Sequence, residues 1–144
     1  MKIAILEDNP AIYEYMKLAL EMAGHHAHIY TQASALLEIL LKKAKGSSVL
    51  PYDLVTVDLH LPGDLTGYEF IHRVRDSLAA NRLPIIIVSG AAPSFLGPIQ
   101  ANFPHIPILQ KPFQMKRLLQ LLEEMKPLED QAEQQGQSNG NYHE

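Results

Sequence analysis

Residues 53–63 read DLVTVDLHLPG. In this stretch an apolar run ends in a single carboxylate, Asp58, and a proline and a glycine follow shortly afterwards. A short apolar run bounded by turn residues is typical of a buried strand. A strand that ends in an acid can present a nucleophile or a metal ligand, but such an acid more often simply begins a loop. The role of Asp58 therefore depends on which other residues reach the same edge of the sheet.

Four other segments are predicted to be strands. Segments 2–6 and 84–89 are apolar without alternation, as expected for strands of a parallel sheet that is covered on both faces. Segment 106–109 is a shorter strand of the same kind. Segment 25–30 contains His25, His26 and His28, and its polar content predicts a strand at the edge of the sheet.

Apolar residues at helical spacing fill the segments between these strands. Asn9 is a suitable N-cap, and Pro10 is a suitable first residue, for the first helix. Gly97 and Pro98 interrupt the fourth helix, which we expect to be irregular. The five predicted helices begin at Pro10, after Thr31, at Gly67, at Ala92 and at Phe113.

Strands that alternate with helices predict an α/β fold with parallel strands and right-handed crossovers. The expected architecture is a five-stranded, doubly wound parallel sheet of order 2-1-3-4-5, which is the flavodoxin-like (βα)5 arrangement. In such sheets the ligand site lies at the carboxyl ends of the strands. Residues 1–126 form the predicted domain, and residues 127–144, rich in Gln, Glu, Gly and Asn, are predicted to be a disordered tail.

Composition narrows the classes of function. The 144 residues carry a formal net charge of −4 and contain no basic cluster, so we expect no nucleic acid partner. There is no cysteine, which excludes disulfides, thiolate zinc sites and thiol nucleophiles. The apolar runs are too short for a signal peptide or a membrane span, and we therefore expect a cytoplasmic protein.

Several polar residues follow the predicted strands at the edge where the ligand site is expected. They are Glu7, Asp8, Asp58, Ser89 and Lys111. Carboxylates that converge repel one another, and a divalent cation with oxygen ligands, such as Mg²⁺, relieves the repulsion. A metal, a lysine and a hydroxyl around a carboxylate are typical of a site that binds a phosphoryl group. In such a site the carboxylate can attack phosphorus.

At this spacing, these residues together with Pro112 resemble the receiver domain of two-component response regulators. The resemblance covers residues 2–126 and is closest in kind to stand-alone, chemotaxis-regulator-like receivers. It implies a signalling switch and not an enzyme, apart from self-catalysed phosphorylation and dephosphorylation.

The resemblance also implies roles for single residues. Asp58 would accept a phosphoryl group from a sensor histidine kinase or a phosphotransfer protein. Glu7, Asp8, Asp58 and the backbone carbonyl of His60 would hold Mg²⁺. Ser89 would form a hydrogen bond to a phosphoryl oxygen.

The resemblance further implies that Lys111 pairs with another phosphoryl oxygen. The Lys111-Pro112 peptide bond is similar to one that is usually cis in the family. Gly90 is small where the family has a small residue, which leaves the phosphoryl group accessible.

Three features depart from the commonest pattern of the family. The loop from Asp58 to Gly67 is one residue longer, although its sequence is similar to a recurring variant. Position 108 is Ile where the family has a switch aromatic, so the usual coupling of the hydroxyl to an aromatic rotamer is absent. No output domain is expected in the sequence after residue 126.

Three alternative functions remain open. A receiver-like interaction module that has lost phosphorylation would fit Ile108. A phosphohydrolase with an aspartyl-phosphate intermediate would need a second acid two residues after Asp58, where the chain has His60. A flavodoxin-like cofactor binder would need a hydroxyl-rich or glycine-rich loop after the first strand, where the chain has acids.

The expected partners are a kinase or phosphotransfer protein and a downstream protein that the sequence does not identify. A homodimer through the fourth helix, fifth strand and fifth helix would be consistent with the family. No membrane partner is expected.

Overall fold

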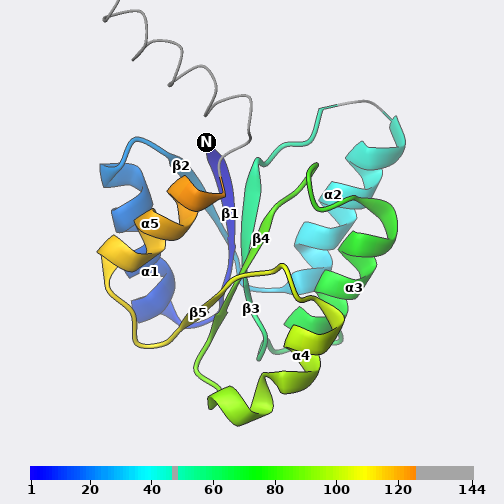
Figure 1. The fold of residues 1–144 in the computed structure, drawn as a ribbon. Helices are drawn as coiled ribbons and strands as arrows, with labels where there is room; N and C mark the ends of the chain where they lie inside the picture. The colour runs from blue at the N-terminus through cyan, green and yellow to red at the C-terminus, as the bar shows by residue number, and fades with distance from the viewer. Residues whose placement is uncertain (47–48, 126–144) are drawn as a thin grey trace, which may run out of the picture.

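A computed structural model describes residues 1–46 and 49–125, and in it five parallel strands alternate with helices (Figure 1). The order of the strands is β2-β1-β3-β4-β5, which confirms the predicted sheet. The elements are, in chain order, β1 (Lys2–Leu6), α1 (Pro10–Met22), β2 (His26–Tyr30), α2 (Ala33–Gly46), β3 (Leu54–Asp58), α3 (Gly67–Ser77), β4 (Ile85–Ser89), the 3-10 turn η1 (Pro93–Phe95), α4 (Gly97–Asn102), β5 (Ile108–Gln110) and α5 (Met115–Glu124).

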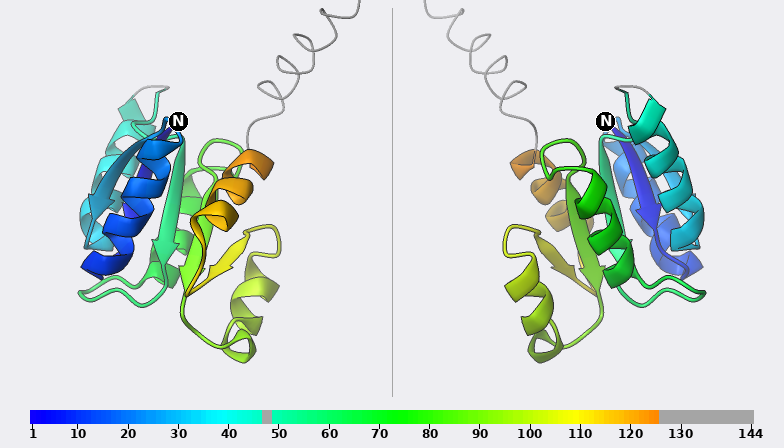
Figure 2. Two further views of the ribbon diagram at one scale, coloured as in Figure 1. Left: turned by 90° about the vertical axis from the view of Figure 1, so that its left-hand side faces the viewer. Right: turned by 90° about the vertical axis from the view of Figure 1, so that its right-hand side faces the viewer.

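A layer of helices covers each face of the sheet (Figure 2). α1 and α5 pack on one face through an apolar cluster that includes Met16, Leu20 and Leu118. α2, α3 and α4 pack on the other face around Phe70 and Leu36. Because both faces are covered, β3 and β4 are buried along their whole length, as their continuous apolar sequences predict.

The register of the strands brings the strand ends to one edge. Leu6 of β1 lies beside Val57 of β3, so the residues after Leu6 lie near Asp58. Asp58 in turn lies beside Val88 of β4, one residue before Ser89. β2 forms the outer edge next to β1, where its polar residues predicted it.

The helix starts follow from local chemistry. Oδ1 of Asn9 accepts hydrogen bonds from the backbone amides of Ala11 and Ile12, and Pro10 is the first residue of α1, as predicted. Thr66 and Glu69 form a capping box at the start of α3. These caps satisfy amides that have no partner inside their own helices.

Three elements begin two or more residues later than the sequence predicts. The segment 92–101 forms η1 and then α4, because Pro98 lacks an amide and is suited to the first turn of a new helix. The last strand starts at Ile108 and not at residue 106, since the amide of Ile106 donates to the carbonyl of Phe103 and closes a turn. The final helix starts at Met115, after an irregular stretch that contains Phe113.

The predicted tail, residues 127–144, and Lys126 lie outside the described residues. Within residues 1–46 and 49–125, no helix is both long enough and apolar enough to cross a membrane.

Candidate functional site

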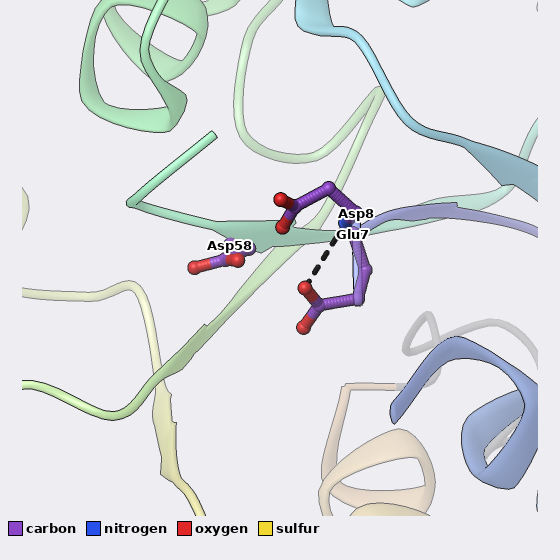
Figure 3. A group of neighbouring side chains, drawn as sticks. All are labelled: Glu7, Asp8 and Asp58. Carbon is purple, nitrogen blue, oxygen red and sulfur yellow. Dashed lines mark hydrogen bonds between the residues drawn. The ribbon is translucent and has the colours of Figure 1, made fainter. Parts of the chain in front are cut away.

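Three carboxylates meet at the carboxyl ends of the neighbouring strands β1 and β3 (Figure 3). Glu7 and Asp8 follow β1, and Asp58 is the last residue of β3. One oxygen from each of the three lies within 4.8 Å of the other two. Glu7 and Asp58 are buried, whereas Asp8 is exposed. The side chains that the sequence places at this edge are therefore close enough to bind one cation together.

Lys111 is the cation that reaches this cluster from the end of β5. Its Nζ lies 2.6 Å from Oε1 of Glu7 and 3.4 Å from Oδ2 of Asp58. The backbone amide of Lys111 donates to the carbonyl of Ser89 at 2.8 Å, which ties it to the end of β4. The peptide bond between Lys111 and Pro112 is cis, as the family resemblance implies.

Glu7 is the most constrained of the three acids. Its Oε2 accepts hydrogen bonds from the amides of Asp8 at 3.0 Å and Asn9 at 3.2 Å. Burial raises the pKa of Glu7 above its usual range, and the neighbouring carboxylate of Asp58 raises it further, while Lys111 opposes the shift. A single ammonium thus does not fully offset the cost of burying this charge.

Asp58 is held by its own loop. Its Oδ1 accepts a hydrogen bond from the amide of His60 at 3.1 Å, and Oδ2 faces Lys111. The side chain of His60 is exposed. The loop turns at Gly63, whose φ of +102° lies in the region that favours glycine.

Gly67 packs directly against the backbone of Asp58. A β-carbon at position 67 would lie 2.0 Å from the carbonyl oxygen of Asp58, far inside van der Waals contact. Only glycine permits this approach, so Gly67 fixes the distance between the start of α3 and the end of β3. The sequence places Gly67 at the start of the helix, and the capping sequence Thr66 to Glu69 supports that start, but no local pattern indicates this contact.

Ser89 stands at the end of β4 and is fully buried. Its Oγ accepts a hydrogen bond from the amide of Ala91 at 3.1 Å, so the hydroxyl is engaged with its own loop. A β-carbon at Gly90 would only reach ordinary contact with Lys111. The structure thus brings Glu7, Asp8, Asp58 and Lys111 together, with Ser89 on the neighbouring strand end.

The profile of the response regulator receiver domain family matches residues 3–123. The chain belongs to this family. Receiver domains are signalling switches of two-component systems and not classical enzymes. None of the curated proteins compared with the chain matches it.

Solved receiver structures share the fold of this chain. A CheY-like receiver domain from Methylobacillus flagellatus is 25% identical with a TM-score of 0.71, over 88% of this chain and 98% of that one. Chemotaxis protein CheY4 of Vibrio cholerae is 20% identical with a TM-score of 0.69, over 87% and 98%. The response regulator TrrA of Thermotoga maritima, solved in complex with Mg²⁺-BeF, is 22% identical with a TM-score of 0.68, over 87% and 98%.

Proposed function

We propose that this receiver domain is a phosphoacceptor switch and that Asp58 is the residue that accepts the phosphoryl group. The observation that carries the proposal is the position of Lys111, whose ammonium lies between the buried carboxylates of Glu7 and Asp58. A carboxylate beside a fixed ammonium can act as a nucleophile toward phosphorus while the ammonium neutralises phosphoryl oxygens. The phosphoryl donor would be a sensor histidine kinase or a phosphotransfer protein.

The donor set at this site fits Mg²⁺. Three carboxylates lie within 4.8 Å, and the exposed side of Asp8 leaves room for the water ligands that Mg²⁺ retains. Lys111 only partly offsets the cost of burying the Glu7 carboxylate. A second positive charge beside Glu7 is therefore favoured. We assign Glu7, Asp8, Asp58 and the backbone carbonyl of His60 as the residues that would hold it. When bound, Mg²⁺ supplies positive charge to the phosphoryl oxygens.

The proposed reaction transfers the phosphoryl group from a phosphohistidine to Asp58. A carboxylate oxygen of Asp58 attacks phosphorus, so that an O–P bond forms while the N–P bond of the donor breaks. The electron pair of that bond returns to the imidazole nitrogen. Lys111, already 3.4 Å from Oδ2 of Asp58, balances charge on the transferred group. The hydroxyl of Ser89 donates a hydrogen bond to a phosphoryl oxygen, while its oxygen still accepts from the amide of Ala91.

On this proposal residues 1–126 form the receiver unit, and phosphorylation changes the surface that a downstream protein recognises. The movement of Ser89 toward the phosphoryl group would carry the change into the loop before η1, since Ser89 and Ala91 are joined there by a hydrogen bond.

The test is phosphorylation by a small phosphodonor with Mg²⁺, followed by intact-mass measurement. The wild-type protein should gain one phosphoryl group, and Asp58→Asn should gain none. Asp76→Asn is the matched control, because Asp76 is an exposed acid on α3. Equal phosphorylation of Asp58→Asn and wild type would overturn the assignment of the acceptor.

A receiver-like interaction module without phosphorylation is the second candidate. Ile108 favours it, because this residue is half-buried against the core at the position where the family has a switch aromatic. A wild-type protein that takes up no phosphoryl group in the same experiment, yet is folded, would select this candidate.

A further inference from the structure

Tyr15 connects α1 to the beginning of α5. Its hydroxyl accepts a hydrogen bond from the backbone amide of Met115 at 2.9 Å, across 100 positions of sequence. Its ring also meets the ring of Phe113 edge to face, with 5.8 Å between the centroids. Two different contacts thus join one side chain of α1 to the segment that precedes α5.

The hydrogen bond from Met115 takes the place of a helix cap. The first amides of any helix have no partner inside that helix. At α5 the N-cap residue is Gln114, whose side chain makes no capping hydrogen bond. The hydroxyl of Tyr15, on α1, therefore accepts a hydrogen bond from an N-terminal amide of α5. In α1 and α3 the side chains of the N-cap residues Asn9 and Thr66 are the acceptors for such amides.

The segment from Lys111 to Met115 is fastened at its two ends. At the first, the amide of Lys111 is bonded to the carbonyl of Ser89, and at the second the amide of Met115 is bonded to Tyr15. Between them, Pro112 and Phe113 line an open apolar groove of about 350 Å³ together with Ala11, Ile12, Tyr15 and the stem of Lys111. One side of this segment faces the groove and has no packing partner there. The backbone path of the segment therefore depends more strongly on its contacts with Tyr15.

We infer that Tyr15 is a positioning residue that acts through Lys111 on phosphoryl transfer to Asp58. The ammonium of Lys111 must stay near the carboxylates of Glu7 and Asp58, and small displacements of such a group are costly for transfer. Tyr15 does not contact the reacting atoms. It holds the far end of the segment that carries Lys111. The inference rests on the proposed function and adds to it a residue outside the acidic cluster.

The first test compares Tyr15→Phe with wild type. This change keeps the ring on Phe113 and removes only the oxygen that accepts from Met115. We expect the rate of phosphorylation by a small phosphodonor, at saturating Mg²⁺, to fall about 2- to 10-fold, the range that one hydrogen bond can supply. Mg²⁺ is kept saturating because Lys111 pairs with Glu7, a proposed ligand, so that a change in Mg²⁺ affinity does not enter the measured rate.

Tyr68→Phe is the matched control. The hydroxyl of Tyr68 also accepts one hydrogen bond, here from the side-chain amide of Asn102 at 2.8 Å, but this bond joins α3 to α4 and does not involve the segment of Lys111. Both variants should lose a similar small amount of thermal stability, and only Tyr15→Phe should be slower. Equal rates for the two variants would overturn the inference.

A double-mutant cycle separates positioning from a general structural effect. In a Lys111→Met background, Tyr15→Phe should cause no further loss of rate, because the group through which it acts is absent. A loss as large as in the wild-type background would contradict the inference. NMR spectra of the same proteins with isotope-labelled lysine give an independent measurement. The side-chain signal that is missing in Lys111→Met belongs to Lys111. Tyr15→Phe should shift that signal, and Tyr68→Phe should not.

Failure of the inference and failure of the proposed function give different results. A wild-type protein that takes up no phosphoryl group refutes the proposed function, and with it the role of Tyr15. A wild-type protein that is phosphorylated at Asp58, with unchanged rate and unchanged Lys111 signal in Tyr15→Phe, refutes the role of Tyr15 alone.

Discussion

Lys111 forms its shorter ion pair with Glu7, at 2.6 Å, and a longer one of 3.4 Å with Asp58. In this arrangement the ammonium mainly neutralises the more deeply buried acid. A cation bound by the same carboxylates would compete with Lys111 for Glu7 and leave the ammonium free to meet a phosphoryl oxygen beside Asp58. Glu7 therefore links the proposed metal site to the proposed phosphoryl site.

Glu7→Gln should stabilise the protein when Mg²⁺ is removed. Glutamine keeps an oxygen that accepts from the amides of Asp8 and Asn9, but it carries no buried charge. Because burial and Asp58 raise the pKa of Glu7, the charged form costs stability at neutral pH, and its removal should raise the free energy of unfolding by roughly 1 kcal/mol. Urea unfolding in the presence of a chelator measures this.

Glu14→Gln serves as the control for that experiment, because Glu14 is an exposed acid on α1 and should have no effect. A lower free energy of unfolding for Glu7→Gln would mean that the ion pair with Lys111 outweighs the cost of burial.

Mg²⁺ should raise the melting temperature of the wild-type protein. A ligand that binds only the folded state at about 100 times its dissociation constant stabilises that state by about 2.7 kcal/mol. Asp8→Ala removes one of the three carboxylates and should abolish most of this gain, whereas Asp64→Asn, an exposed acid of the nearby loop, should retain it. Differential scanning calorimetry with and without Mg²⁺ measures this rise in melting temperature. An equal rise in Asp8→Ala and wild type would exclude Asp8 as a ligand.

The sequence predicts most of this fold because all strands but the edge strand β2 lie in largely apolar runs. Their parallel order then predicts that Glu7, Asp8, Asp58 and Lys111 meet, without any knowledge of side-chain geometry. The sequence predicts the start of β5 two residues too early, because an apolar residue such as Ile106 can occupy a turn or a strand. Only the hydrogen bond from the amide of Ile106 to the carbonyl of Phe103 shows that this residue lies in a turn.

The finer geometry of the site could not be predicted. Whether Lys111 lies closer to Glu7 or to Asp58 depends on rotamers and on the path of the chain after β5. The hydrogen bond between Tyr15 and Met115 joins residues that no local pattern relates. The contact of Gly67 with the Asp58 carbonyl likewise depends on how α3 approaches the end of β3.

Thr56→Val should stabilise the protein. Thr56 lies in the centre of β3, and its buried hydroxyl has no hydrogen-bond partner among the described residues. Valine has nearly the same shape, so the change removes an unsatisfied polar group without leaving a cavity, and the free energy of unfolding should rise by about 1 kcal/mol. Urea unfolding measures it.

The same substitution at Thr66 should have the opposite sign. Thr66 caps α3 through its hydroxyl, and Thr66→Val should lower the free energy of unfolding by about 1 kcal/mol. For Thr56→Val, by contrast, a lower free energy of unfolding than wild type would show that the hydroxyl of Thr56 has a hydrogen-bond partner in solution, for instance a buried water.

Gly67→Ala should be destabilising and should also slow phosphorylation. The added β-carbon would lie 2.0 Å from the carbonyl oxygen of Asp58, and because that oxygen belongs to the backbone, either α3 or the end of β3 must move. Overpacking of this kind lowers the free energy of unfolding by about 1–3 kcal/mol, and the shift reaches the proposed acceptor itself. Gly97→Ala is the control, because a β-carbon there meets nothing within 4 Å. If Gly67→Ala melted and reacted with a phosphodonor as Gly97→Ala does, α3 would not set the position of Asp58, and the role assigned to this glycine would be wrong.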